Sequence, residues 1–332
     1  MGEFAENLER IALDLIKNMV RGDATLRVPQ NPASVVATRP FRRVSYNNRR
    51  SRHSFCLLVY MLAKTHRLQV HGGSYTVRGL YYGDPQLFRS QSRIASARLD
   101  VCRMLGTSPL QLGVLAASKG LMAGNIRLLM VNGDVLDCSS YGGAMTLPTD
   151  PEKVDSIETQ ADLVVIVEKE SVFESLVSGN IFSTFGRSLI LITGKGYPDC
   201  CTRRIVYRLA HENRLPAYIL VDADPFGIEI MHTYRHGSKA MSFSSHGLAT
   251  PSLRWIGLHP SEIPVLGRQA VALGTGDNKK INDLLARSDL EPGVRQELRI
   301  MQEVQLKAEI ESVIDFLADD YIPNKINRKL YL

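Results

Sequence analysis

Acidic side chains follow two aliphatic segments of the kind that form buried strands. Glu168 comes directly after residues 163–167, and Asp222 and Asp224 come directly after residues 217–221. Ligands of an open parallel sheet bind at the carboxyl ends of its strands, so we expect the three carboxylates at one edge. Neighbouring carboxylates repel one another unless a cation lies between them, and all-oxygen ligation favours magnesium or manganese over zinc. The spacing therefore predicts a site for Mg²⁺ or Mn²⁺.

Each carboxylate also has a purely structural interpretation. Pro225 follows Asp224, and proline is favoured at the first position of a helix, so Asp224 is also a candidate N-cap. Glu168 and Asp222 are candidates for ion pairs at strand ends. Taken together, the three carboxylates follow two separate strands, and this arrangement favours the metal interpretation.

A tyrosine pair, Tyr81 and Tyr82, offers a nucleophile. Arg78 stands four residues before Tyr82, so on a helix its guanidinium and that phenol share a face. A cation in this position favours the phenolate and the phosphate that it would attack. Tyr81 points roughly 100° away on the same helix. The alternative is that the pair is an ordinary buried aromatic contact.

Three basic residues near the predicted acidic edge are candidates for binding nucleic-acid phosphates: Lys195, Arg203 and Arg204. Lys195 lies between Gly194 and Gly196, in a turn that follows a third aliphatic segment. This turn lacks the spacing of a nucleotide-binding P-loop, so no ATPase is predicted. The glycines are also explained by a tight turn alone.

The composition is that of a folded protein with a basic balance. The chain has 332 residues, with 40 Lys and Arg against 34 Asp and Glu, a net charge of +6. Arginines crowd the range from Arg39 to Arg52, which would attract a polyanion or form a solvated linker. No apolar run approaches the about 18 residues of a membrane span, and five cysteines without C-x-x-C spacing indicate reduced thiols. We expect a soluble, non-secreted protein of about two domains.

Hydrophobic patterns indicate how the first half is built. An amphipathic helix is predicted over residues 4–20, and residues 23–49 are interpreted as a loop, hairpin or basic linker, so that a domain begins near Arg50. Helices follow over residues 55–68 and 94–105. Between them a short segment begins at Thr76, a candidate N-cap, and carries the tyrosine pair.

A predicted hairpin completes this first domain. Residues 126–131 and 135–138 flank Asn132 and Gly133, a strong hairpin signal. Helices followed by a two-stranded wing are typical of a winged-helix (CAP-like) domain, here placed at residues 50–150.

The second half alternates strand and helix. Aliphatic segments over residues 163–167, 189–192 and 217–221 are typical of strands that are buried on both faces of a parallel sheet. Helical patterns lie between them, so residues 151–332 are predicted to form an α/β domain. It ends in an amphipathic helix expected over residues 295–317.

Five motifs occur in order along the chain. They are V-R-G-L-Y-Y-G-D-P-Q-L-F at 77–88, S-K-G-L-M-A-G-N at 118–125, V-E-K-E at 167–170, T-G-K-G-Y-P-D at 193–199 and D-A-D-P-F-G-I-E-I at 222–230. Together they closely resemble the meiotic DNA double-strand-break transesterase family. The members of this family are the eukaryotic relatives of the A-type subunit of DNA topoisomerase VI. The similarity runs from about Phe55 to the I-P-N-K at 322–325. It implies a winged-helix domain with a catalytic tyrosine, followed by a Toprim domain with an acidic metal site.

The resemblance also implies roles for individual residues. Tyr82 falls on the nucleophile and Arg78 on its cationic neighbour, while the metal positions fall on Glu168, Asp222 and Asp224. The implied reaction leaves a 5′-phosphotyrosyl link and a free 3′-hydroxyl, and two copies of the chain are needed to cut two strands. Gly79 departs from the family, which often has an acid after the arginine.

The same resemblance implies partners and a location. They are double-stranded DNA, a topoisomerase VI B-like subunit, the accessory proteins of meiotic break formation and a second copy of the chain, on chromosomes in the nucleus. The region before Arg50 matches poorly, so residues 1–22 are assigned to the B-like partner by analogy alone.

Two other functions stay open from the sequence. The A-type component of a true ATP-dependent type IIB topoisomerase would share these residues and reseal the break with an ATP-hydrolysing partner. A non-catalytic winged-helix DNA-binding protein would share the basic surface but gives no reason for the acidic residues.

Overall fold

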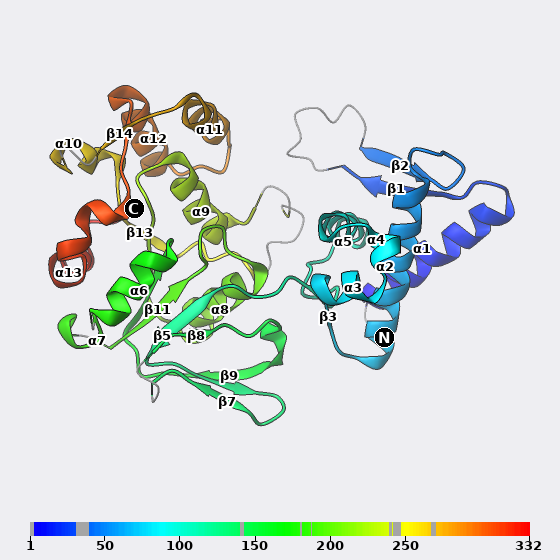
Figure 1. The fold of residues 1–332 in the computed structure, drawn as a ribbon, viewed down its shortest axis with the longest axis horizontal. Helices are drawn as coiled ribbons and strands as arrows, with labels where there is room; N and C mark the ends of the chain where they lie inside the picture. Colours follow the sequence, from blue (N-terminus) through cyan, green and yellow to red (C-terminus); the bar gives the residue numbers. More distant parts are fainter. Residues whose placement is uncertain are drawn as a thin grey trace. The chain divides into compact units, whose positions relative to one another are not determined.

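The computed structural model describes residues 3–30, 40–139, 143–179, 181–186, 188–238, 241, 247–266 and 270–332. The chain divides into two compact units, drawn in Figure 1. One unit comprises Met1–Ala117 with Ser238–His246, and the other comprises Ser118–Gly237 with Gly247–Leu332. Among the described helices, none has the length and apolar character needed to cross a membrane.

Helices dominate the described part of the first unit. They are α1 (Glu3–Val20), α2 (Arg52–His71), α3 (Val77–Gly83), α4 (Pro85–Phe88) and α5 (Gln91–Leu105). The strands are β1 (Thr25–Pro29) and β2 (Phe41–Ser45), which pair antiparallel, and β3 (Tyr75–Thr76) and β4 (Val114–Leu115), which pair in parallel. The helices expected near residues 55–68 and 94–105 are confirmed as α2 and α5.

Of the loop, hairpin or basic linker predicted for residues 23–49, the described residues form the hairpin, and it belongs to the first domain. β1 and β2 form a hairpin whose inward side chains, Leu26, Val28 and Val44, are buried in the same core as α2 and α5. Leu8 and Leu15 of α1 are buried there too. The domain therefore begins with α1 and not near Arg50, because the alternating apolar residues of a strand need a core to cover them. Arg39 lies outside the described residues.

A six-stranded, mostly parallel sheet forms the centre of the described second unit, in the order β13-β12-β10-β11-β5-β8. Its parallel strands are β10 (Leu163–Val167), β11 (Leu189–Thr193), β12 (Ala217–Leu220) and β13 (Arg254–Gly257), and β5 (Leu121–Gly124) and β8 (Met145–Thr146) extend it antiparallel. Every residue of β10 is buried, with Val164 in one core cluster and Val165 in the other. Both faces are covered, as the continuous aliphatic run predicts.

The helices of this unit flank the sheet (Figure 1). They are α6 (Glu170–Ser178), α7 (Ile181–Thr184), α8 (Cys200–His211), α9 (Pro225–His236), α10 (Ile263–Leu266), α11 (Thr275–Leu285), α12 (Pro292–Val304) and α13 (Ile322–Asn327), with 3₁₀ turns at Pro151–Lys153 and Pro260–Glu262. Residues of α8 and α9 belong to one core cluster and residues of α6 to the other. The helices therefore lie on both faces of the sheet.

The hairpin around Asn132 and Gly133 is present, but it is not a wing of the first unit. β6 (Arg127–Met130) pairs with β7 (Val135–Asp137) and also with β9 (Val154–Glu158). Leu128 and Ile157 are buried in the core of the second unit. The predicted boundary at residue 150 is therefore wrong, because pairing with β9 and burial on the sheet keep the hairpin in the second unit.

The helix predicted over residues 295–317 ends early. α12 ends at Val304, and Gln305 takes a left-handed conformation with φ 53°. β15 (Leu306–Lys307) then pairs with β14 (Val271–Ala272), and Ala308 forms a bridge to Ala223. A 3₁₀ segment (Ile310–Phe316) and a π turn (Leu317–Tyr321) lead into α13. The bridge to Ala223 brings this segment next to the end of β12.

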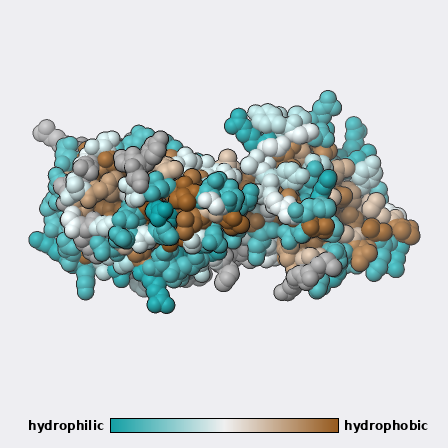
Figure 2. Space-filling view, turned by 90° about the horizontal axis from the view of Figure 1, so that it is seen from below, coloured by the Kyte–Doolittle hydropathy of each residue, from teal (hydrophilic) through white to brown (hydrophobic). Residues whose placement is uncertain are grey.

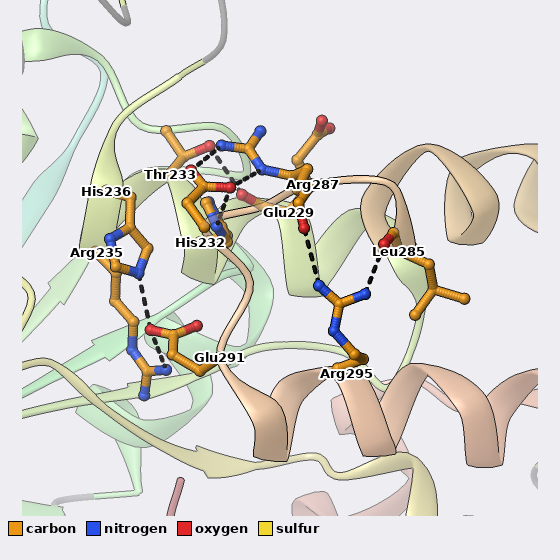
Figure 3. A network of polar contacts seen from close by, with 10 residues as sticks. Glu229, His232, Thr233, Arg235, His236, Leu285, Arg287, Glu291 and Arg295 are labelled. Carbon is orange, nitrogen blue, oxygen red and sulfur yellow. Dashed lines mark hydrogen bonds and ion pairs between the residues drawn. The ribbon is translucent and has the colours of Figure 1, made fainter.

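Polar contacts fix the second half of α9 (Figure 3). Nε2 of His236 lies 2.8 Å from Oε1 of Glu291, and Arg235 pairs with the same carboxylate at 3.3 Å. Glu291 is the residue before α12. The contacts therefore tie α9 to α12 and help to fix the helix that begins directly after Asp224.

Candidate active site

A short, capped helix carries the tyrosine pair. As predicted, Thr76 is the N-cap of α3, and its Oγ1 accepts a hydrogen bond of 2.9 Å from the backbone N–H of Gly79. A Cβ on Gly79 would lie 3.0 Å from this oxygen, so the departure from the family pattern suits a close cap. Asp84 ends α3 and caps α4 by accepting a hydrogen bond from Leu87. The start of the helix with the tyrosines is thus fixed by a cap, and its end leads directly into α4.

The two tyrosines have different surroundings. Tyr82 is 61% exposed, whereas Tyr81 is partly buried and packs against the core of the first unit. The rings meet edge to face with their centroids 5.4 Å apart. The guanidinium of Arg78 lies over the Tyr82 ring, as the four-residue spacing predicts. Of the pair, Tyr82 is the one whose side chain is exposed.

Two basic side chains near this helix were not predicted. His53 of α2 contacts the carbonyl of Leu87 through Nε2 at 2.7 Å, and Arg93 of α5 lies 3.0 Å from Nδ1 of His53. They come from helices on either side of α3 and α4 in the sequence. No local spacing relates them, so a sequence pattern could not find them.

The acidic residues meet at the carboxyl ends of β10 and β12. Oε2 of Glu168 accepts a hydrogen bond of 3.0 Å from the backbone N–H of Asp222. Asp224 caps α9, since its Oδ1 accepts a hydrogen bond of 2.6 Å from Gly227. A Cβ on Gly227 would lie 3.0 Å from Oε2 of Glu168, so glycine allows the strand end and the helix start to approach. The predicted edge and the predicted cap are both confirmed.

Burial raises the pKa values of the three carboxyl groups at this edge. Burial and then the charge of Asp222 raise the pKa of Glu168 to about 8. Burial also raises the pKa of Asp222 to about 6, although Ile310 and Lys169 oppose the shift. For Asp224, burial again raises the pKa. A cation placed among these carboxylates would relieve the cost of burying their charge.

The predicted three-carboxylate metal site is not assembled in this conformation. Within the described ranges, no three His, Cys, Asp or Glu side chains are arranged to hold a metal ion. Oδ1 of Asp222 accepts a hydrogen bond from the backbone of Ile310, and Oδ2 lies 2.9 Å from Nζ of Lys169. Asp224 is engaged as a cap. The donors have the oxygen chemistry that Mg²⁺ prefers, but they are turned toward partners within the protein.

Lys169 is the residue at this edge that the sequence reasoning missed. The sequence could have indicated Lys169, because the V-E-K-E motif places this lysine directly after Glu168. Lys119 was missed as well, although it lies in the S-K-G motif. Its Nζ donates a hydrogen bond of 2.9 Å to the carbonyl of Lys195, which supports the turn after β11.

The three basic residues predicted to bind DNA do not form an exposed cluster. Arg203 is 3% exposed, and its Nε donates a hydrogen bond to the carbonyl of Leu248. The prediction for Arg203 is therefore wrong, because its position on α8 turns the guanidinium into the protein. Nζ of Lys195 lies 2.6 Å from Oε1 of Glu170, and Nε of Arg204 lies 2.9 Å from Oε1 of Glu152. Both are ion-paired within the second unit.

Comparisons with known proteins match both parts of the chain. Residues 163–326 match the Toprim domain that Spo11 shares with the A-type component of topoisomerase 6, and residues 53–114 match the family described as "Type IIB DNA topoisomerase". The chain is 76% identical to the meiotic recombination protein W68 of Drosophila melanogaster, over the full length of both. It is 33% identical to human SPO11, covering 98% of this chain and 87% of the relative. It is 30% identical to the A-type subunit of DNA topoisomerase 6 from Arabidopsis thaliana, covering 98% of this chain and 80% of the relative.

Proposed function

The chain belongs to the family of Spo11 and the A-type topoisomerase VI proteins, and on this premise we propose that it initiates meiotic recombination by cutting DNA through a tyrosine transesterification. It is a type IIB topoisomerase-like enzyme of a family that makes DNA double-strand breaks. The meiotic assignment follows from the 76% identity with a meiotic recombination protein, against 30% with a topoisomerase. Meiotic recombination implies a nuclear protein, and we place its action on chromosomes.

Tyr82 is the nucleophile in this proposal. Its Oη forms a bond to phosphorus as the bond from phosphorus to the 3′ oxygen breaks. The phenol loses its proton, and the leaving oxygen gains one to become a 3′-hydroxyl. The product is a 5′-phosphotyrosyl link. Arg78 favours the phenolate and the charge that develops on the phosphate, since its guanidinium lies over the Tyr82 ring.

The acidic edge holds the cofactor in this proposal. Glu168, Asp222 and Asp224 would ligate Mg²⁺, or Mn²⁺, after the side chains turn away from their present partners. A divalent ion supplies positive charge that stabilises a transferring phosphoryl group. The raised pKa values of the buried Glu168 and Asp222 support this assignment, because they mark a place that favours added positive charge.

The β1–β2 hairpin supports DNA binding by the first unit. Arg27 and Arg43 lie opposite each other in its register, and both are exposed. Like charges in directly opposed positions of a hairpin repel one another. Nη2 of Arg43 lies 3.4 Å from Oδ2 of Asp23, which balances part of this charge, and a DNA phosphate would balance the rest. We propose that this hairpin, and not the one predicted around Gly133, serves as the wing of a winged-helix (CAP-like) domain.

Two copies of the chain are needed for a double-strand break, because one tyrosine cuts one strand. We propose a homodimer in which the tyrosine of one copy acts with the acidic edge of the other. The reaction exchanges one phosphodiester for another and so needs no external energy source. Accessory proteins of meiotic break formation would place this dimer on chromosomes.

The first helix is proposed to bind the B-like subunit. Leu8 and Leu15 are covered by the first unit, but Leu13, Ile16, Met19 and Val20 remain exposed. Leu13, Ile16 and Met19 line a groove of about 630 Å³ between α1 and α2, whose lining is mostly apolar. Figure 2 shows apolar side chains exposed on the unit that carries α1. An apolar face of this kind is typical of a surface that is covered by a partner.

The observation that carries the proposal is the exposed Tyr82 on a capped helix with a guanidinium over its ring. The test is to incubate the purified chain and its partner with DNA labelled at the 3′ ends. After denaturation, labelled DNA attached to protein through a 5′ end supports the proposal, and labelled DNA that remains free of protein contradicts it. ATP-dependent decatenation with the B-like partner would instead favour a true type IIB topoisomerase.

A further inference from the structure

One ammonium group lies among three carboxylates at the acidic edge. Nζ of Lys169 lies 2.9 Å from Oδ2 of Asp222, 3.2 Å from Oε2 of Glu309 and 2.7 Å from Oε2 of Glu311. Asp222 follows β12, whereas Glu309 and Glu311 flank the start of the 3₁₀ segment after β15. Lys169 therefore joins parts of the chain that are far apart in the sequence.

We propose that Lys169 is a resident counter-cation that competes with magnesium for Asp222 and is held by Glu309 and Glu311 once the ion binds. It is a positioning residue, and the inference rests on the magnesium site proposed above. In the metal-free protein the ammonium neutralises a carboxylate that is otherwise buried. Magnesium can use that carboxylate only after the ammonium leaves it.

The contacts of Asp222 indicate which partner has to leave. Its side chain is 8% exposed, and both of its oxygens are engaged. One contact is with the backbone N–H of Ile310, which the bridge between Ala223 and Ala308 holds in place. The other is with the end of a long lysine side chain. A flexible side chain moves at lower cost than a paired backbone segment, so Lys169 is the partner that yields to a metal.

The structure also provides a place for the displaced ammonium. Glu311 and Glu309 already contact Nζ, and their side chains are 42% and 72% exposed. The charge of Lys169 therefore stays paired and close to water after it leaves Asp222. Glu309 and Glu311 flank Ile310, so one short segment has two roles. Its backbone at Ile310 binds Oδ1 of Asp222, and its two carboxylates hold the Lys169 ammonium after this leaves Oδ2.

Lys195 provides a matched control. It is also a lysine in the same unit, with a side chain 27% exposed against 24% for Lys169, but its Nζ pairs with Glu170 at 2.6 Å. Replacing either lysine by glutamine removes one positive charge. Only Lys169→Gln removes a cation that is bound to Asp222.

Calorimetric titration of the full chain with magnesium chloride tests the inference. We expect Lys169→Gln to bind magnesium about tenfold more tightly than the wild type, since one charge-assisted hydrogen bond no longer has to be broken. Lys195→Gln should stay within about twofold of the wild type. In EDTA, Lys169→Gln should melt at a lower temperature than Lys195→Gln, because its carboxylates lose their counter-ion.

Unchanged or weaker magnesium binding in Lys169→Gln, with binding intact in the wild type, would overturn the inference. Equal binding in the wild type and in Glu168→Gln would instead overturn the proposed metal site itself. If Lys169→Gln does not fold, Glu309→Gln with Glu311→Gln provides a second test. This double variant leaves Asp222 as the carboxylate that holds the Lys169 ammonium, so magnesium binding should weaken. The control is Glu170→Gln with Glu174→Gln, which removes the same charge and should weaken magnesium binding less. An equal or smaller loss contradicts the inference.

Discussion

The guanidinium carbon of Arg78 lies 5.7 Å from the centre of the Tyr82 ring, one turn earlier on the same short helix. The pair places a permanent positive charge beside an exposed phenol. Tyr81, the residue before Tyr82, is partly buried and packs against the core instead. Two adjacent, chemically identical residues therefore have different surroundings, and on this difference we base the proposal that Tyr82 is the nucleophile.

Tyr82→Phe tests the nucleophile. It keeps the ring, and so nearly all of the apolar contact area, but removes the attacking oxygen. Folding and DNA affinity should be preserved, and 5′-linked protein should disappear. Tyr81→Phe is the control and should retain cleavage, with a stability change of about 1 kcal/mol or less. Adducts that persist in the Tyr82 variant and vanish in the Tyr81 variant would reverse the assignment.

Arg78→Lys tests the role of the guanidinium. Lysine keeps the charge but loses the planar group that lies over the ring and can contact two phosphate oxygens. We expect adduct formation at saturating DNA to slow by about tenfold, with a smaller change in DNA affinity. The two quantities are measured separately, by single-turnover cleavage and by equilibrium binding. An equal loss in both would make Arg78 a DNA-binding residue only.

Glu168→Gln tests the metal site. Magnesium binding and DNA breaks should be lost, while the metal-free protein should be as stable as the wild type or more so. The reason is that the pKa of Glu168 is raised to about 8, so an amide avoids the cost of either protonating this carboxylate or burying its charge beside Asp222. Calorimetry and thermal melting in EDTA measure the two effects. Unchanged magnesium affinity in this variant and in Asp222→Asn would exclude the assignment.

Asp224→Asn separates capping from metal binding. Asparagine caps a helix about as well as aspartate, so α9 should remain intact. A drop in magnesium affinity without a drop in melting temperature would identify Asp224 as a ligand. No change in either quantity would leave it as a cap alone.

Ile16→Glu with Met19→Glu tests the partner surface of α1. Both side chains are at least half exposed, so the double variant should fold and bind DNA but fail to co-purify with the B-like subunit. Leu8 and Leu15 of the same helix are unsuitable for this test, because both are buried in the first unit. Leu8→Ala should instead cost about 2–5 kcal/mol of stability. Co-purification of the Ile16 and Met19 variant would contradict the proposed surface.

Two buried histidines predict a loss of stability in acid. Burial lowers the pKa of His232 and of His259 from 6.5 to about 4. At these two groups the unfolded chain binds more protons than the folded chain between these values, so their contribution lowers the free energy of unfolding as the pH falls from 6.5 to 4. The loss should approach about 3 kcal/mol for each histidine. Protonation would also break the contact between Nδ1 of His259 and Lys325.

Urea denaturation between pH 7 and pH 4.5 measures this effect. His259→Gln should lose less stability than the wild type between pH 7 and pH 4.5, whereas His71→Gln, at an exposed position of α2, should follow the wild type. The pKa values of Asp289 and Glu291 are lowered to about 2, so their contribution to stability is lost only at a pH below this range. Glu168 and Asp222, whose pKa values are raised, act in the opposite direction in every variant, so the comparison between variants is decisive. The same pH dependence in His259→Gln and in the wild type would contradict the prediction.

Several features followed from the sequence because their causes are local. The run at 163–167 is a strand with the predicted bounds, since five aliphatic residues in a row suit only a position with both faces covered. Thr76 and Asp224 cap their helices because each side chain reaches a backbone N–H three residues ahead. The face shared by Arg78 and Tyr82 follows from the helical repeat.

Other features were decided by tertiary structure, because they depend on contacts between distant residues. The hairpin at Gly133 was recognised, but its place in the second unit depends on pairing with β9. The basic character of Arg203 is visible in the sequence, and its burial is not. Lys169 stands next to Glu168, yet it faces Glu311, 142 residues away. Local spacing determined which chemical groups reach the acidic edge, and the packing of distant segments decided which atoms they meet there.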